Sequence, residues 1–265
     1  MAVEVVATVE EAVRMVPDGS FLYVGGASLR RKPMMLLRAL VDVGRVELSV
    51  MTFAGSVDIE VLVGSGAATS VSSAYVGLGS LGFAPAFKRA AETGSIDDRE
   101  YSEWTMLAGL RAAAMGVPFI PTRGGLGSEL LDHLEPEMID DPYGTGSYLA
   151  IAPIRPDVTV LHAWRATPAG SVQMAWPPEH LWDVDVVAAR ASDRTIVTVE
   201  EIVPDHVVAS DAHLTVLNAA DVDVVVQAPG GSWPTAGPPV HEEDHEVIRA
   251  YATEGDLSVL MRRAA

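Results

Sequence analysis

Apolar runs of strand length alternate with segments of helical periodicity along most of the chain. Six runs are expected as strands: "FLYVGG" (21–26), "ELSVMTFA" (47–54), "VPFIPT" (117–122), "DVTVLHA" (157–163), "RTIVTVE" (194–200) and "DVDVVVQA" (221–228). Helices are expected at 9–15, 33–43, 84–93, 103–115, 179–191 and 242–253. Near-continuous apolar runs are typical of strands buried on both faces of a parallel sheet. The pattern predicts an α/β fold with an open, mainly parallel sheet and helices on both faces.

Local signals refine this picture at two places. Thr8 and Glu11 form a capping box that opens the first helix. Residues 136–156, "PEMIDDPYGTGSYLAIAPIRP", are rich in proline and glycine and lack helical periodicity, which predicts a long functional loop or a small antiparallel excursion. A chain of 265 residues suits one large α/β domain or two small ones. We expect one domain over residues 1–265.

The charge balance narrows the functional classes. The chain has 18 Lys and Arg residues against 36 Asp and Glu residues, a formal net charge of -18. Such a charge repels phosphate backbones, so nucleic acid is not an expected partner. No stretch approaches the roughly 20 apolar residues that a membrane span needs. The first 16 residues contain acids where a secretory signal has bases, and we therefore expect a cytoplasmic protein without a membrane partner.

Two short motifs match known patterns only formally. "HEEDH" at 241–245 fits the metalloprotease pattern, but Pro238 and Pro239 place His241 at a helix entrance, with acids following in the first turn. "GLGSLG" at 77–82 follows a candidate strand at 70–76, but no acid follows at the end of a second strand as a dinucleotide site requires. Cysteine is absent, which excludes a thiol nucleophile and a Cys-ligated metal. We expect no metal site and no dinucleotide site.

Histidine and serine give no clear sign of a hydrolase. The chain lacks a Gly-x-Ser-x-Gly elbow and a Walker loop. His162 ends a predicted strand and is interpreted as a hydrogen-bonded structural residue, with a catalytic base as the alternative.

The cluster "GGASLRRKPM" at 25–34 is a stronger candidate for binding. Backbone amides of a glycine turn and of a helix N-terminus attract anions, and adjacent cations reinforce that attraction. Pro33 suits the first position of the following helix. The predicted ligand contacts are Gly25, Gly26, Arg30, Arg31 and Lys32. The alternative is a solvated basic turn whose cations pair with surface acids.

Four segments together resemble the alpha subunit of family I coenzyme A transferases, particularly the glutaconate CoA-transferase type, over about residues 18–205. They are "YVGGASLRRKPMMLLRALV", "SAYVGLGSLGFAPAFKRAAETGSI", "REYSEWTMLAGLRAAAMGVPFIPTRGGLGSELL" and "VTVLHAWRATPAGSVQ". The CoA-dependent ring-cleaving hydrolases of steroid degradation carry similar "RRKPM" and "P-x-R-x-G-L-G-S" segments. Thr167 and Ser171 depart from the pattern, because family members often have Asp and Asn there.

The resemblance implies a heteromeric enzyme, with the active site between an alpha and a beta subunit in an α2β2 assembly. A glutamate attacks the acyl-CoA thioester, and an acyl-glutamyl anhydride and a glutamyl-CoA thioester follow. That glutamate belongs to the beta subunit, and no glutamate of this chain lies in a Glu-x-Gly-x-Gly setting. Glu100 and Glu103 are the local substitutes, and both are expected near a helix start. Coenzyme A enters as a thioester substrate, with a small organic acid as the second substrate and no bound cofactor.

Arg123 is the most site-like residue, because it follows a predicted strand and precedes a glycine-rich loop. A guanidinium there can hold a substrate carboxylate or the partner's catalytic glutamate in a bidentate pair. Further substrate or CoA contacts are predicted at Gly124, Gly125, Gly127 and Ser128. The alternative for Arg123 is a salt bridge to Glu129 or Asp132. A ring-cleaving hydrolase subunit and a non-catalytic binding subunit are the alternatives to the transferase.

Overall fold

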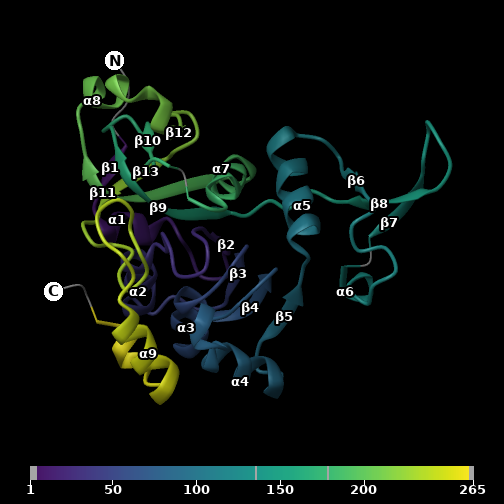
Figure 1. Ribbon diagram of the computed structural model, residues 1–265, viewed down its shortest axis with the longest axis horizontal. Helices are drawn as coiled ribbons and strands as arrows, with labels where there is room; N and C mark the ends of the chain where they lie inside the picture. The colour runs from purple at the N-terminus through teal and green to yellow at the C-terminus, as the bar shows by residue number, and fades with distance from the viewer. Residues whose placement is uncertain (1–4, 135, 178, 263–265) are drawn as a thin grey trace.

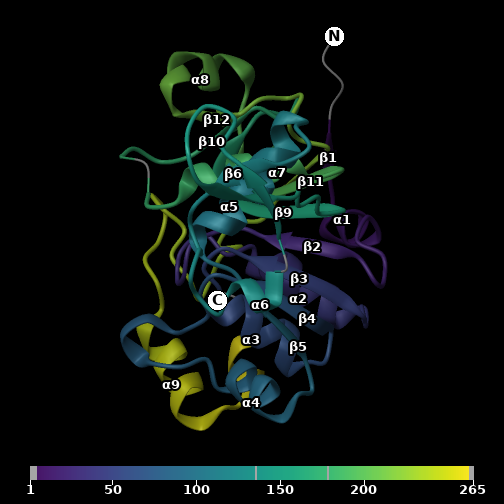
Figure 2. The same ribbon diagram turned by 90° about the vertical axis from the view of Figure 1, so that its right-hand side faces the viewer.

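Neighbouring strands in the spatial order of the main sheet run parallel to each other from one edge to the other. The computed structural model describes residues 5–134, 136–177 and 179–262. The ten-stranded sheet has the order β1-β13-β11-β9-β2-β3-β4-β5 (Figure 2), and β10 and β12 add antiparallel pairs beside β9. The bounds are β1 (Val6–Ala7), β2 (Phe21–Val24), β3 (Leu48–Thr52), β4 (Ala68–Ser73), β5 (Asp97–Glu100), β9 (Val158–Ala166), β10 (Val172–Gln173), β11 (Arg194–Ile202), β12 (Thr215–Leu217) and β13 (Val224–Gln227). The predicted parallel sheet is confirmed.

Helices cover both faces of this sheet. One face packs against α1 (Val9–Arg14), α2 (Met34–Asp42), α3 (Val57–Gly64), α4 (Pro85–Thr93), α9 (His245–Glu254) and α10 (Leu257–Leu260). The other face packs against α5 (Glu103–Met115) and α7 (Trp182–Ala191). A shorter helix, α8 (Asp205–Ser210), lies near the β10–β12 pair (Figure 1). Among the described residues, no helix combines the length and apolarity needed to cross a membrane.

A small antiparallel sheet projects from the main body beyond α5 (Figure 1). It consists of β6 (Ile120–Thr122), β8 (Ser147–Ile151) and β7 (Glu137–Asp140), in that spatial order, with α6 (Leu131–Leu134). The antiparallel excursion expected in 136–156 is therefore confirmed. The placement of "VPFIPT" in the main sheet was wrong, because its last residues pair with β8. A short apolar run does not specify which sheet it joins.

Two of the elements that sequence reasoning missed, α3 and β5, were missed for opposite reasons. The α3 helix is buried almost all round, so its apolar residues show no amphipathic period. The β5 strand has the sequence DDRE and is exposed at every position. It forms an edge of the sheet, where charged side chains are favourable because they oppose further strand pairing.

The strand order reverses direction between β2 and β9. From β2 the chain proceeds through β3 and β4 to β5 at one edge, whereas from β9 it proceeds through β11 to β13 on the other side. Open α/β sheets bind ligands outside the carboxyl ends of the strands at such a switch point. A ligand site is therefore expected among the segments that follow β2, β3, β4 and β13.

Candidate active site

A cavity of about 660 Å³ lies at the carboxyl ends of β2 to β5. Its wall contains residues 27–30 after β2, Ala54 after β3 and residues 74–75 after β4. The titratable side chains in the wall are Arg30, Tyr75, Glu103, His180, Glu243 and His245. A volume of this size suits a small-molecule ligand. The cavity lies on the β2 side of the switch point, and we take it as the candidate active site.

The two glycines after β2 allow the chain to pack closely upon itself. Gly26 has φ 79°, and a Cβ there would lie 2.5 Å from the Arg30 carbonyl oxygen. A Cβ on Gly25 would lie 2.3 Å from the Leu161 side chain and 2.8 Å from Asp185 Oδ1. The Gly26 amide donates to Asp185 Oδ1 at 3.0 Å. In this structure the chain's own residues occupy the positions where a ligand was expected to contact these glycines.

Arg30 and Arg31 are paired with carboxylates of this chain. Glu179 bridges them, with one oxygen on Arg30 and the other 3.0 Å from Arg31 Nε. Arg31 is 3% exposed and also binds Asp185. Of the two arginines, only Arg30 lines the cavity. The predicted anion-receiving turn is thus neutralised by internal acids, and its role in ligand binding remains a prediction.

Lys32 is held even more completely inside the protein. Its ammonium group, 0% exposed, donates to Gly26 O at 3.1 Å, Thr52 Oγ1 at 3.2 Å and Ala54 O at 2.8 Å. These three bonds use all three N–H groups, and Asp58 Oδ2 lies 2.9 Å away as an ion-pair partner. Lys32 therefore ties the ends of β2 and β3 together, and a ligand in the cavity does not reach its ammonium in this structure.

Arg123 lies at the end of β6, exposed to solvent. It forms no ion pair or side-chain hydrogen bond with Glu129 or with any other side chain that the structure describes, and the Asp132 side chain lies outside that description. Thr122 Oγ1, next to Arg123, accepts from Trp104 Nε1 at 2.6 Å. Because Trp104 follows Glu103 on α5, this bond links the Arg123 loop to a residue of the cavity wall.

The loop after Arg123 has the backbone geometry that its glycines predict. A Cβ on Gly124 would lie 2.7 Å from Trp104 Cδ1, so a larger residue would displace the tryptophan. Gly125 and Gly127 have φ 95° and 78°, which other residues rarely adopt. The Ser128 hydroxyl donates to Gly125 O at 2.7 Å and closes the turn. These residues shape the loop, and their predicted contacts with substrate or CoA remain untested.

Of the two glutamates considered from the sequence, Glu100 and Glu103, only Glu103 lines the cavity. It is the first residue of α5, after the Ser102 N-cap, and its side chain lines the wall. Glu100, its neighbour in the sequence, ends the exposed edge strand β5 and is absent from the lining. Sequence reasoning considered both glutamates but could not separate them, because the distinction depends on the turn between β5 and α5.

A second polar cluster lies on the neighbouring strands β9 and β11, around the paired residues His162 and Thr198. His162 Nδ1 lies 2.9 Å from Thr198 Oγ1, and His162 Nε2 lies 3.0 Å from Glu200 Oε1. Gly230 donates its amide to Glu200 Oε2 at 2.7 Å. His162 is 2% exposed, in agreement with the structural role expected for it. Glu200 was missed, since one glutamate at a strand end carries no distinctive signal.

This cluster does not form a serine hydrolase triad. Ser232 Oγ and Glu200 Oε1 lie 3.1 Å and 3.5 Å from the same nitrogen, His241 Nε2. A triad needs the serine and the acid on opposite ring nitrogens, so that the acid fixes the tautomer that accepts the serine proton. The cluster instead fastens residues 230–241 to β11.

The protonation states follow from these contacts. Burial raises the pKa of Glu200, but hydrogen bonds from His162, His241 and the Gly230 amide outweigh burial and lower it to about 2. The hydrogen bond to Glu200 raises the pKa of His241 above its usual range. Burial lowers the pKa of His162. Glu200 is therefore ionised at neutral pH, and protonated His241 is the favoured partner.

Stability should consequently depend on pH through His241. A raised pKa in the folded state stabilises the fold below the unfolded pKa, and this contribution disappears as pH rises through the folded value. We expect His241→Gln to lower the free energy of unfolding more at about pH 5.5 than at about pH 8.5. Urea titrations of wild type and variant measure the difference. His206→Gln is the control, because His206 is exposed. An equal loss of unfolding free energy for His241→Gln at both pH values would contradict the raised pKa of His241.

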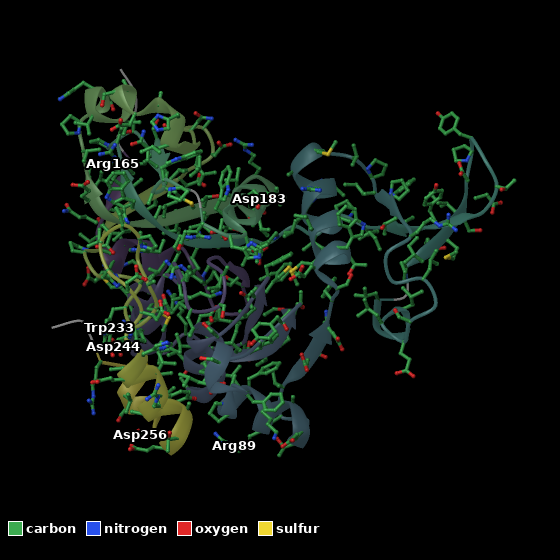
Figure 3. All side chains as sticks on the ribbon, viewed as in Figure 1. Arg89, Arg165, Asp183, Trp233, Asp244 and Asp256 are labelled. Atoms are coloured by element: carbon green, nitrogen blue, oxygen red, sulfur yellow. The ribbon has the colours of Figure 1, made fainter. Side chains whose placement is uncertain are left out.

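The "HEEDH" motif does not form a helical metal site. The α9 helix begins at His245, so His241 lies outside it, and Asp244 is the N-cap, accepting from the Val247 amide. The expected first-turn position of Glu242 and Glu243 was therefore wrong by one turn. Trp233 Nε1 also donates to Asp244 at 3.1 Å, and Figure 3 shows these two residues side by side. Among the described residues, no group of three or more ligating side chains is arranged to hold a metal.

The chain is similar to known proteins over most of its length. It is 29% identical over 260 residues to a cholesterol ring-cleaving hydrolase IpdA subunit of Mycobacterium tuberculosis, covering 94% of this chain and 88% of the relative. It also matches about half, 54%, of a longer uncharacterised protein of Archaeoglobus fulgidus, at 32% identity over 91% of this chain.

Two solved structures extend this similarity to the fold. The glutaconate coenzyme A-transferase of Acidaminococcus fermentans superposes with a TM-score of 0.88 at 26% identity, over 96% of this chain and 85% of that one. A C56S variant of the decarboxylase AibA/AibB superposes with a TM-score of 0.87 at 31% identity, over 97% and 98% of the two chains. The family model for coenzyme A transferase matches residues 6–228. The chain belongs to the coenzyme A transferase family.

Proposed function

We propose that this chain is the alpha subunit of a heteromeric CoA transferase, which moves CoA from an acyl-CoA to a carboxylic acid acceptor. The observation that carries the proposal is the cavity of about 660 Å³ at the carboxyl ends of β2 to β5, beside the switch point. Relatives that share this fold are named as subunits of CoA transferases. A beta subunit completes the site, in an α2β2 assembly, and CoA thioesters are substrates without a further bound cofactor.

The chemistry expected of such a site divides between the two subunits. A glutamate of the partner attacks the thioester carbonyl, which forms an anhydride and releases CoA thiolate. The thiolate then attacks the glutamyl carbonyl of the anhydride, giving a glutamyl-CoA thioester and the free donor acid. The acceptor carboxylate repeats these steps in reverse. In this scheme the cavity holds the acyl group, and Arg123 orients a reacting carboxylate through two parallel hydrogen bonds.

Glu103 favours a second candidate, a CoA-dependent ring-cleaving hydrolase. A carboxylate in the cavity wall can act as the base that activates water, without a nucleophile from the partner. The named activity of the mycobacterial relative fits this alternative. The two candidates differ in their products, since transfer forms a new thioester on an added acid whereas hydrolysis proceeds without an acceptor.

We expect the purified chain alone to show no CoA transfer, because the nucleophile belongs to the partner. The complex isolated through a tag on this chain should convert an added acid to its CoA thioester, as measured by liquid chromatography. Glu103→Gln should leave transfer within about threefold of wild type, as Glu100→Gln should, because neither glutamate is the nucleophile.

Two results would reject this assignment. Transfer by the lone chain would place the nucleophile within it. Acceptor-independent product that is lost in Glu103→Gln but kept in Glu100→Gln would establish the hydrolase.

A further inference from the structure

Arg30 is the cation in the described part of the cavity wall, and three carboxylates surround it. Besides Glu179, it contacts Glu243 at 3.4 Å and Glu242 at 3.5 Å. The Arg30 side chain is 38% exposed and lines the cavity, and it is already paired with these carboxylates there. A carboxylate on a ligand would have to displace an internal carboxylate to obtain a bidentate bond with Arg30.

The remainder of the wall adds negative charge and apolar surface. Glu103 and Glu243 both line the cavity. Leu29, Ala54 and Leu181 are among the apolar residues of the wall. The wall carries two carboxylates against one guanidinium, and Arg30 is also paired with the carboxylates of Glu179 and Glu242.

We propose that the cavity selects acyl groups without a second carboxylate, so that its preferred thioesters carry a neutral, largely apolar acyl chain. A second carboxylate would lose hydration and meet net negative charge, whereas a methyl group at the same place would gain apolar contact. This inference rests on the proposed function.

Butyryl-CoA and succinyl-CoA provide a matched pair of probes, since they differ by a terminal methyl group against a terminal carboxylate. Isothermal titration of the complex at pH 8 measures the dissociation constant of each. We expect butyryl-CoA to bind about tenfold more tightly or better. Succinyl-CoA bound as tightly as butyryl-CoA, or more tightly, overturns the inference. Absence of binding by either thioester overturns the proposed function, and the inference falls with it.

Charge-removing variants test whether these acids set the preference. Glu243→Gln should reduce the preference for butyryl-CoA by about threefold to tenfold, and the more exposed Glu242→Gln should reduce it less. Glu254→Gln, at the end of α9, removes an equal charge away from the cavity and should leave the preference unchanged. An unchanged preference in Glu243→Gln contradicts the proposal.

Discussion

Arg123→Ala is expected to lower kcat/KM of the complex about 100-fold, with folding and subunit association retained. Arg123 is exposed and lacks a partner among the described side chains, so its removal leaves no buried charge unpaired. A charge-assisted hydrogen bond that serves the transition state contributes a few kcal/mol, which corresponds to a loss of this size. Arg123→Lys keeps the charge but loses the planar two-pronged geometry, and it should also impair catalysis.

Kinetics and association must be measured on the same preparation. Arg194→Ala is the matched control, because Arg194 is an exposed arginine at the start of β11, in the main sheet and outside the cavity lining. Sedimentation or co-purification reports association, and steady-state assays report kcat and KM. Normal kinetics in a stable Arg123→Ala complex would reject the active-site role. Weakened association with normal turnover would make Arg123 an interface residue instead.

Lys32→Met is expected to destabilise the fold by about 3–5 kcal/mol, the second large effect. The substitution leaves the Asp58 carboxylate, which is 0% exposed, without its counter-charge. Adding Asp58→Asn removes that charge and preserves an oxygen for the Ser56 amide, which donates to Asp58 Oδ1 at 2.6 Å. The double variant should therefore recover part of the lost stability, as urea unfolding would show.

Lys88→Met is the control for this experiment. Lys88 is exposed and lies 3.8 Å from Glu92, and a surface pair of this kind contributes about 1 kcal/mol or less. If Lys32→Met cost no more than Lys88→Met, the buried pair would not stabilise the turn after β2. The comparison also separates a structural role from ligand binding, because unfolding is measured without substrate.

Much of the fold was predictable because its signals are local. The strand at Phe21–Val24 is a continuous apolar run, Arg194–Ile202 is rich in β-branched residues, and α1 begins with the capping box that Thr8 and Glu11 predict. The elements that were missed have different origins. The α3 helix is buried almost all round and has no polar outer face, and β5 is charged because it is an edge strand. Both features follow from position in the tertiary structure. The single-domain assignment for 1–265 remains a prediction.

The candidate site was less predictable, because the cations of a segment do not show which acids will pair with them in the folded protein. "LRRK" indicates an anion site, yet its partners Glu179, Asp185 and Asp58 come from distant segments. Glu103 and Glu100 are indistinguishable in the sequence, and the turn between β5 and α5 sends only one of them to the cavity. Pairings between residues on separate elements leave no local pattern in the sequence.

By itself the sequence determined the α/β class, most helices and strands, and the resemblance to CoA transferases. These properties depend on periodicity, caps and short motifs, and each of these signals lies within a short stretch of sequence. Only the tertiary structure decided that β6 leaves the main sheet, that Lys32 is inaccessible and that Arg30 meets the cavity already paired. The physical reason is that burial and electrostatic environment depend on which distant residues fill the surrounding space, and local sequence does not specify them.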